Sequence, residues 1–72
     1  MRQKMQFKAV FDLNDDGSIT PHFTIRVGGV IVQENTPIRP GFIIGGIDLT
    51  QYKDHDLEVE IEDGTYVIKG IY

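Results

Sequence analysis

The sequence predicts a small all-β domain, a barrel-like or sandwich fold of about six antiparallel strands with one short helical turn. Three observations support this fold class. Apolar and polar residues alternate with a period of two in several windows, and glycine-bearing turn signals separate those windows. No window has the spacing of a long amphipathic helix. The 72 residues are expected to form a single domain, near the lower size limit for a lone hydrophobic core.

The first strands follow from an alternating pattern on either side of a tight turn. A three-residue loop with Gly17 in the left-handed conformation sets Asn14 opposite Ser18 and brings the large apolar side chains to one face. Val27-Gly28-Gly29-Val30 predicts a second, two-residue turn, so a three-stranded meander is expected over 4–34. The apolar positions that alternate are Met5, Phe7, Ala9 and Phe11, followed by Phe23, Ile25 and Val27.

Irregular structure is expected in the middle of the chain. Two prolines and a glycine make 35–41 a loop. The apolar residues at 42–44 are expected to form a short buried strand. Asp48 can cap a helical turn over 48–52.

A final hairpin is predicted over 57–71. Glu62-Asp63-Gly64-Thr65 is a strong turn signal. The resulting register sets Ile61 opposite Tyr66, and Glu58 opposite Lys69 as an exposed ion pair.

Composition and charge narrow the classes of function. There is no cysteine, which excludes disulfides and thiolate chemistry. No segment resembles a signal peptide or a membrane helix, so we expect a cytoplasmic protein that does not bind membranes. The net charge is −4, and seven of the eleven acidic residues follow residue 40. Because phosphates would be repelled, direct binding to nucleic acid is not expected.

The first turn has a second interpretation as a calcium-binding loop. Residues 12–19 match the first eight positions of such a loop, with oxygen ligands at Asp12, Asn14 and Asp16. The twelfth position, where a carboxylate is required, holds Phe23. Asn, Asp and Gly are also the preferred residues of a tight hairpin, and this is the interpretation we favour. No other cofactor is expected.

No catalytic site is predicted. Ser18 is the only serine and lies beside the turn glycine, outside any nucleophile motif. The paired glycines at 28–29 and 45–46 lack the frame of a phosphate-binding loop. We therefore expect a protein that is not an enzyme.

The remaining candidates are surfaces for a protein partner or for a second copy of the chain. We expect a stand-alone inhibitor, adaptor or immunity-type factor that contacts its partner through an acidic hairpin face or an outer apolar face. The alternatives are a small calcium- or divalent-metal-binding module and an acidic mimic of nucleic acid. The candidate contact residues are Glu58, Glu60 and Glu62 on the acidic face, and Val10, Ile31, Val67 and Ile71 on the apolar face.

Overall fold

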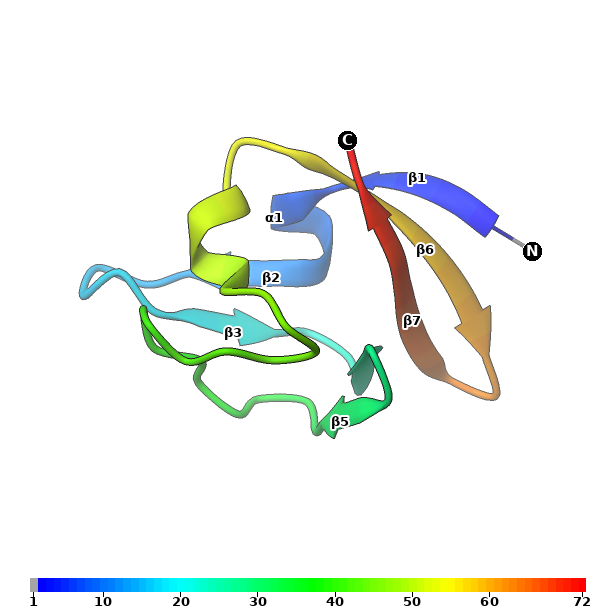
Figure 1. The fold of residues 1–72 in the computed structure, drawn as a ribbon, viewed down its shortest axis with the longest axis horizontal. Coiled ribbons are helices and arrows are strands. Elements are labelled where there is room, and N and C mark those ends of the chain that lie inside the picture. The colour runs from blue at the N-terminus through cyan, green and yellow to red at the C-terminus, as the bar shows by residue number, and fades with distance from the viewer. Residues whose placement is uncertain (1) are drawn as a thin grey trace.

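A computed structural model describes residues 2–72, which form two β-sheets (Figure 1). The strands are β1 (Arg2–Gln6), β2 (Phe11–Leu13), β3 (Ile19–Pro21), β4 (Ile25–Val27), β5 (Val30–Val32), β6 (Asp56–Glu62) and β7 (Thr65–Ile71). Five of them form a sheet in the order β1-β6-β7-β4-β5, and β2 pairs with β3. The all-β prediction is confirmed. The larger sheet is not a closed barrel, because β1 and β5 remain as its two edges.

The two hairpins predicted in the first half of the chain have the predicted registers. Leu13 pairs with Ile19, which agrees with Asn14 opposite Ser18. Val27 pairs with Val30 across the second turn, and both of its glycines have positive φ. In each case the glycine conformation defined the turn and the turn defined the register.

The C-terminal hairpin has the predicted turn, but the register differs from the prediction at the end away from the turn. Ile61 pairs with Tyr66, as expected. The ion pair expected between Glu58 and Lys69 is wrong, because a β-bulge shifts the register and Glu58 pairs with Gly70. Lys69 is therefore the extra residue of the bulge.

The predicted meander over 4–34 is wrong beyond its hairpins. β1 does not continue into β2, because a four-residue helix, α1 (Phe7–Val10), interrupts the strand. β1 pairs instead with β6, and β4 runs parallel to β7. As helix and strand periods overlap in a short window, the alternation at Phe7 and Phe11 also suited a helical turn. The helical turn buries Val10 together with both phenylalanines, whose rings stack at 4.7 Å.

The long connection between β5 and β6 lies against the smaller sheet (Figure 1). The predicted strand at 42–44 is wrong: Phe42 and Ile43 are exposed, and only Ile44 is buried. Ile44 forms an isolated bridge to Ile47 across a two-glycine turn. Earlier in the connection, Ile38 bridges to Ile19 on β3.

The predicted helical turn is confirmed as a 3-10 helix, η1 (Leu49–Tyr52). The Asp48 carboxylate accepts hydrogen bonds from the hydroxyl and the N–H of Thr50, at 2.6 and 3.0 Å. It also accepts one from the N–H of Gly41 at 2.8 Å. These bonds, the Thr50 hydroxyl first, hold the pKa of Asp48 below its ordinary value.

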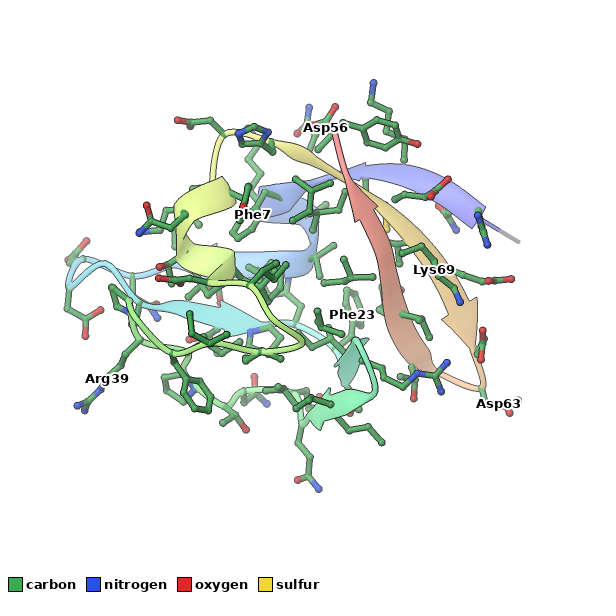
Figure 2. All side chains as sticks on the ribbon, in the orientation of Figure 1. Phe7, Phe23, Arg39, Asp56, Asp63 and Lys69 are labelled. Carbon is green, nitrogen blue, oxygen red and sulfur yellow. The ribbon has the colours of Figure 1, made fainter. Side chains whose placement is uncertain are left out.

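A single core lies between the inner face of the larger sheet and the layer that contains β2, β3, α1 and η1. Phe7 points into this interior, whereas Arg39 and Asp63 extend outward at separate ends of the molecule (Figure 2). Phe23, predicted to be in the core, is half-buried and stacks on Tyr66 with ring centroids 4.0 Å apart. The most deeply buried apolar side chains are Val10, Phe11, Ile19, Ile25, Ile38, Ile44, Leu49, Leu57 and Val59.

Candidate functional site

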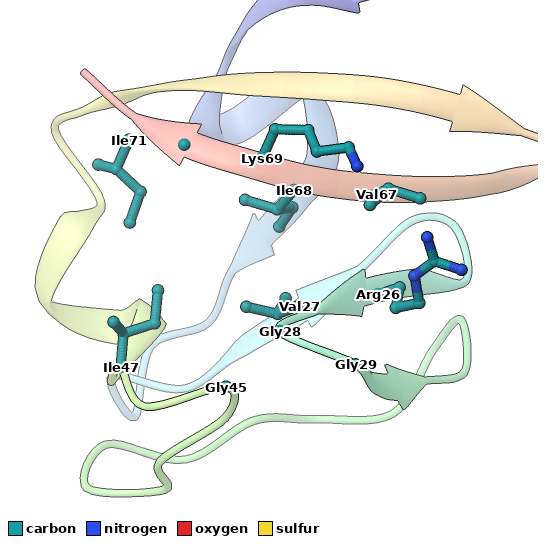
Figure 3. A pocket seen from close by; sticks show the side chains of 11 residues that line it. Arg26, Val27, Gly28, Gly29, Gly45, Ile47, Val67, Ile68, Lys69 and Ile71 are labelled. Carbon is teal, nitrogen blue, oxygen red and sulfur yellow. The ribbon is translucent and has the colours of Figure 1, made fainter.

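A groove lies beside the second half of β7, where the neighbouring strand β4 stops (Figure 3). β4 pairs with β7 only from Tyr66 to Ile68. On its other side β7 stays paired with β6 as far as Ile71. Within the described part of the chain, residues 69–71 therefore have no strand beside them on the β4 side. The groove occupies this place.

Two glycine turns shape the groove by leading the chain away from β7. One is Val27-Gly28-Gly29-Val30, and the other is Ile44-Gly45-Gly46-Ile47. All four glycines have φ between 56° and 88°, a region that L side chains rarely adopt. The turns also touch, because a Cβ atom on Gly45 would lie 2.6 Å from the carbonyl oxygen of Val27. Gly45 is therefore required both for its conformation and for this contact.

The walls of the groove are mainly apolar. Its volume is about 510 Å³, and the side chains of Val27, Ile47, Ile68 and Ile71 surround it (Figure 3). Val27 and Ile68 belong to the core, whereas Ile47 and Ile71 are only partly buried. An apolar side chain placed here would lose contact with water, which stabilises a complex by roughly 25 cal/mol for each Å² buried.

The backbone of Ile71 faces the groove. The N–H of Tyr66 donates to the carbonyl of Thr24 at 2.8 Å, so Tyr66 faces the β4 side. The N–H of Tyr72 donates to the carbonyl of Asp56 at 2.9 Å, so Tyr72 faces β6. Along a strand, the backbone groups of successive residues face the two neighbouring strands in turn. At the bulge, two successive residues of β7 face the same side, so the alternation shifts by one residue. The N–H and C=O of Ile71 therefore point away from β6, toward the groove.

Ion pairs lie along the outer rim of the groove. Arg26 Nη2 on β4 is 3.5 Å from Glu62 Oε1 on β6, and Lys69 Nζ is 3.8 Å from Glu60 Oε1. Because β7 lies between β4 and β6, the Arg26 side chain crosses over β7. Val67, which pairs with Arg26 in the register, is covered and only 5% exposed. The prediction that Val67 faces solvent is wrong for this reason.

The acidic face predicted as a contact surface is matched by basic residues. Glu58, Glu60 and Glu62 do share one face of β6. The pairing of β1 with β6, however, brings the Arg2 guanidinium to 3.8 Å from the carboxylates of both Glu58 and Glu60. With Lys69 on the other side, the acidic residues of β6 lie between basic residues of β1 and β7.

The residues predicted to form an outer apolar face do not form one patch. Ile31 is 63% exposed and lies on β5. Ile71 lies instead in the groove, and Val10 is fully buried in α1, so its predicted exposure is wrong. The exposed apolar residues near Ile31 and the apolar walls of the groove are separate features.

The three predicted calcium ligands make hydrogen bonds within their hairpin. Asp12 Oδ1 is 2.8 Å from His22 Nε2, and Asn14 Nδ2 donates to Ser18 Oγ at 3.0 Å. Asp16 Oδ1 accepts from the Ser18 hydroxyl at 2.5 Å and from its N–H, which lowers the pKa of Asp16. Residues 2–72 contain no group of three or more His, Cys, Asp or Glu arranged to hold a metal ion. These contacts are those of a tight turn, and calcium binding stays a prediction.

Sequence reasoning missed the groove. The two motifs of paired glycines between β-branched residues, at 27–30 and 44–47, were a signal for two similar tight turns. Nothing in their spacing indicates that the turns touch, or that β4 runs parallel to β7. Both facts depend on contacts between residues far apart in the chain.

No protein-family model matches this chain, and no curated protein or solved structure is detectably similar to it. Among residues 2–72, none of the helices has the length and apolar character needed to cross a bilayer.

Proposed function

We propose that this chain is a non-catalytic protein-interaction module that binds an extended segment of a partner protein in the groove beside β7. One observation carries this proposal: the backbone N–H and C=O of Ile71 face an apolar groove in which no described strand continues the sheet. An extended segment would hydrogen-bond to Ile71 and place an apolar side chain against Ile47 and Ile68.

In this mode of binding, the backbone and the side chains of the ligand have different roles. In strand addition, main-chain hydrogen bonds provide affinity and pockets for alternate side chains provide specificity. Gly28, Gly29 and Gly45 line the same groove, and the absence of side chains there leaves room for the backbone of a ligand. The groove therefore has both requirements, a free strand edge and an apolar pocket.

The charged rim favours an apolar ligand segment over a charged one. Arg26 and Lys69 are already paired with Glu62 and Glu60, and exposed ion pairs contribute at most about 1 kcal/mol. The stretch of β7 that is open to a ligand is only three residues long, 69–71, which is short for a standard interface of at least roughly 1,200 Å², so we propose a transient complex. Such binding suits a small inhibitor or adaptor, with the charged residues of the outer face affecting the rate of association.

Selection of random peptides displayed on phage against the wild-type protein tests the proposal. We expect enriched peptides with β-branched or aromatic residues at alternate positions. Ile71→Pro removes the N–H that faces the groove without removing a bond to β6, and we expect it to weaken binding of a selected peptide by about tenfold, equivalent to about 1.4 kcal/mol.

A matched pair of variants separates the groove from general surface effects. Ile47→Gln places a polar group in the groove wall, whereas Ile43→Gln makes the same change at an exposed residue outside the groove. Only Ile47→Gln should weaken peptide binding, with both variants still folded by circular dichroism. Selection that enriches no peptide, or peptides that bind Ile71→Pro and Ile47→Gln as tightly as wild type, would overturn the proposal.

A further inference from the structure

β5 is an edge strand of the larger sheet, and its exposed residues are apolar. Within residues 2–72 no strand pairs with β5 on the side opposite β4. The strand consists of Val30, Ile31 and Val32. Val32 packs into the core, but Val30 and Ile31 are 45% and 63% exposed. A free strand edge with exposed apolar residues is a template for pairing with another strand.

The opposite edge of the same sheet is protected. β1 carries Arg2 and Lys4, whose side chains are 58% and 60% exposed. Charged residues on an edge strand, lysine above all, discourage pairing with a further strand. β5 has no charged residue, no proline and no bulge. The free side of β5 is therefore open in a way that the free side of β1 is not.

The backbone groups of Ile31 point toward the free side of β5. In a two-residue hairpin the residues that flank the turn, here Val27 and Val30, exchange backbone hydrogen bonds. The next pair in the register, Arg26 with Ile31, is then a non-hydrogen-bonded pair, because the two kinds of pair alternate. The N–H and C=O of Ile31 are thus available to a strand added beside β5.

We propose that β5 pairs with the β5 strand of a second copy of this chain, with the two strands antiparallel about a two-fold axis at Ile31. In this register the two Ile31 residues exchange both of their backbone hydrogen bonds, and Val30 of each copy lies opposite Val32 of the other. One step further, Gln33 lies opposite Gly29, which has no side chain to clash. The strand is therefore complementary to itself.

Charge also favours pairing through β5. Arg26 lies one strand in from Ile31, so the two Arg26 residues of a dimer would be three strand spacings apart, or roughly 14 Å. That distance exceeds the screening length of about 8–10 Å at physiological salt. Symmetric pairing of β1 about Gln3 would instead set Arg2 opposite Lys4, which is a destabilising contact between like charges.

An assembly in which different edge strands of neighbouring copies pair with each other would not be closed. Pairing β1 of one copy with β5 of the next leaves one edge of each kind free, and growth would continue as a filament. The exposed lysine on β1 opposes this arrangement. Two paired strands of three residues also bury less surface than a standard interface. The dimer is therefore weak, and its population rises with protein concentration.

Sedimentation equilibrium over a range of protein concentrations tests this inference. We expect the mass to rise from 8.2 kDa toward twice that value. Ile31→Pro removes the donor that the dimer needs, at an edge position whose N–H the sheet does not use. Ile31→Lys gives β5 the same protection as β1. Each variant should weaken dimerisation by about tenfold or more, equivalent to about 1.4 kcal/mol.

Ile43→Lys is the matched control, because Ile43 is 59% exposed and lies outside every strand. This variant should dimerise like the wild type. A wild-type mass that stays at 8.2 kDa at every concentration, or an equal loss of dimer in Ile43→Lys, would overturn the inference. Since no β5 residue lines the groove, peptide binding can persist where dimerisation fails, and the two proposals are tested separately.

Discussion

The two edges of the five-stranded sheet, β1 with five residues and β5 with three, are built in opposite ways. β1 places Arg2 and Lys4 beside the acidic residues of β6, at 3.7–3.8 Å, and its charged side chains remain exposed. β5 presents Val30 and Ile31 to solvent and has no charged residue. An edge that carries charge is stable without a partner strand, whereas an apolar edge is free to accept one. The difference indicates which side of this small domain is available for association.

The largest expected effect comes from the glycine contact that supports the β5 edge. Gly45→Ala would force a Cβ atom to 2.6 Å from the Val27 carbonyl and also require a positive φ. We expect the free energy of unfolding to fall by about 2–5 kcal/mol. Gly46→Ala is the control, because its Cβ would meet nothing within 4 Å, and only the cost of about 1–2 kcal/mol for positive φ applies.

Urea denaturation of both alanine variants measures this difference. Equal destabilisation by Gly45→Ala and Gly46→Ala would show that the close contact between the two glycine turns does not contribute to stability. The turn at 27–30 would then hold β5 in place by itself.

The inward-facing anchors of the two edges should also differ. Val32 on β5 is 9% exposed, whereas Met5 on β1 is only partly buried. Val32→Ala should lower the free energy of unfolding by about 1.5–3 kcal/mol, and Met5→Ala by about 1 kcal/mol. Ile31→Ala removes an exposed side chain and should have almost no effect in dilute protein. If Met5→Ala proved the more damaging change in thermal unfolding, β1 would be the more firmly anchored edge.

Removing the charges of β1 should cost little stability but should open that edge. Arg2→Ala and Lys4→Ala should each change the free energy of unfolding by less than about 1 kcal/mol, and salt should reduce the effect. Lys4→Ile should replace the central charge of β1 with an apolar side chain and increase self-association. Sedimentation velocity of Lys4→Ile measures this, with Lys8→Ile on α1 as the control. No change in association would mean that charge does not protect β1.

The smallest expected effect is the pH dependence that arises away from both edges, at His22. The hydrogen bond to Asp12 raises the pKa of His22 above its usual 6.5, since it favours the protonated ring. This contribution to stability is therefore complete below pH 6.5 and is lost as pH rises through the folded-state pKa. Asp12→Asn should return the pKa of His22 toward 6.5 in an NMR titration. If the pKa of His22 were the same in Asp12→Asn as in the wild type, the hydrogen bond to Asp12 would not be the cause of the raised pKa.

The hairpins of this fold could be predicted from sequence because local chemistry determines them. Gly17, the pair Gly28-Gly29 and Gly64 each permit one kind of turn, and the parity of the flanking apolar residues then defines the register. The pairing of β1 with β6, and of β4 with β7, joins segments far apart in the chain. Such pairings leave no local signal, and the predicted meander was wrong where it replaced them.

Short apolar windows explain the remaining errors in the fold. Phe7-Lys8-Ala9-Val10-Phe11 suits both a strand and a helical turn, and burial of Val10 selects the helical turn. Phe42 and Ile43 were expected in the core because they are apolar. Only Ile44 is needed there, and the exposed pair lies next to the turn that limits the groove.

Little of the candidate site could be predicted. Ile71 and Val67 were identified as contact residues on the assumption of a regular strand, but the bulge at Lys69 and the ion pair of Arg26 changed their surroundings. Ile31 was identified correctly as exposed, because the two-residue turn before it determines which face it occupies. A site that forms where one strand ends beside another can be predicted only when the order and direction of the strands in the sheet are known.

Amide hydrogen exchange at Ile31, measured by NMR in dilute and in concentrated protein, tests most directly whether the β5 edge is open. In dilute protein we expect the Ile31 amide to exchange quickly while its neighbour Val32, bonded to β4, exchanges slowly. At high concentration the Ile31 amide should become protected as the second copy binds. Strong protection of Ile31 in dilute protein, or an exchange rate that never changes with concentration, would contradict the account.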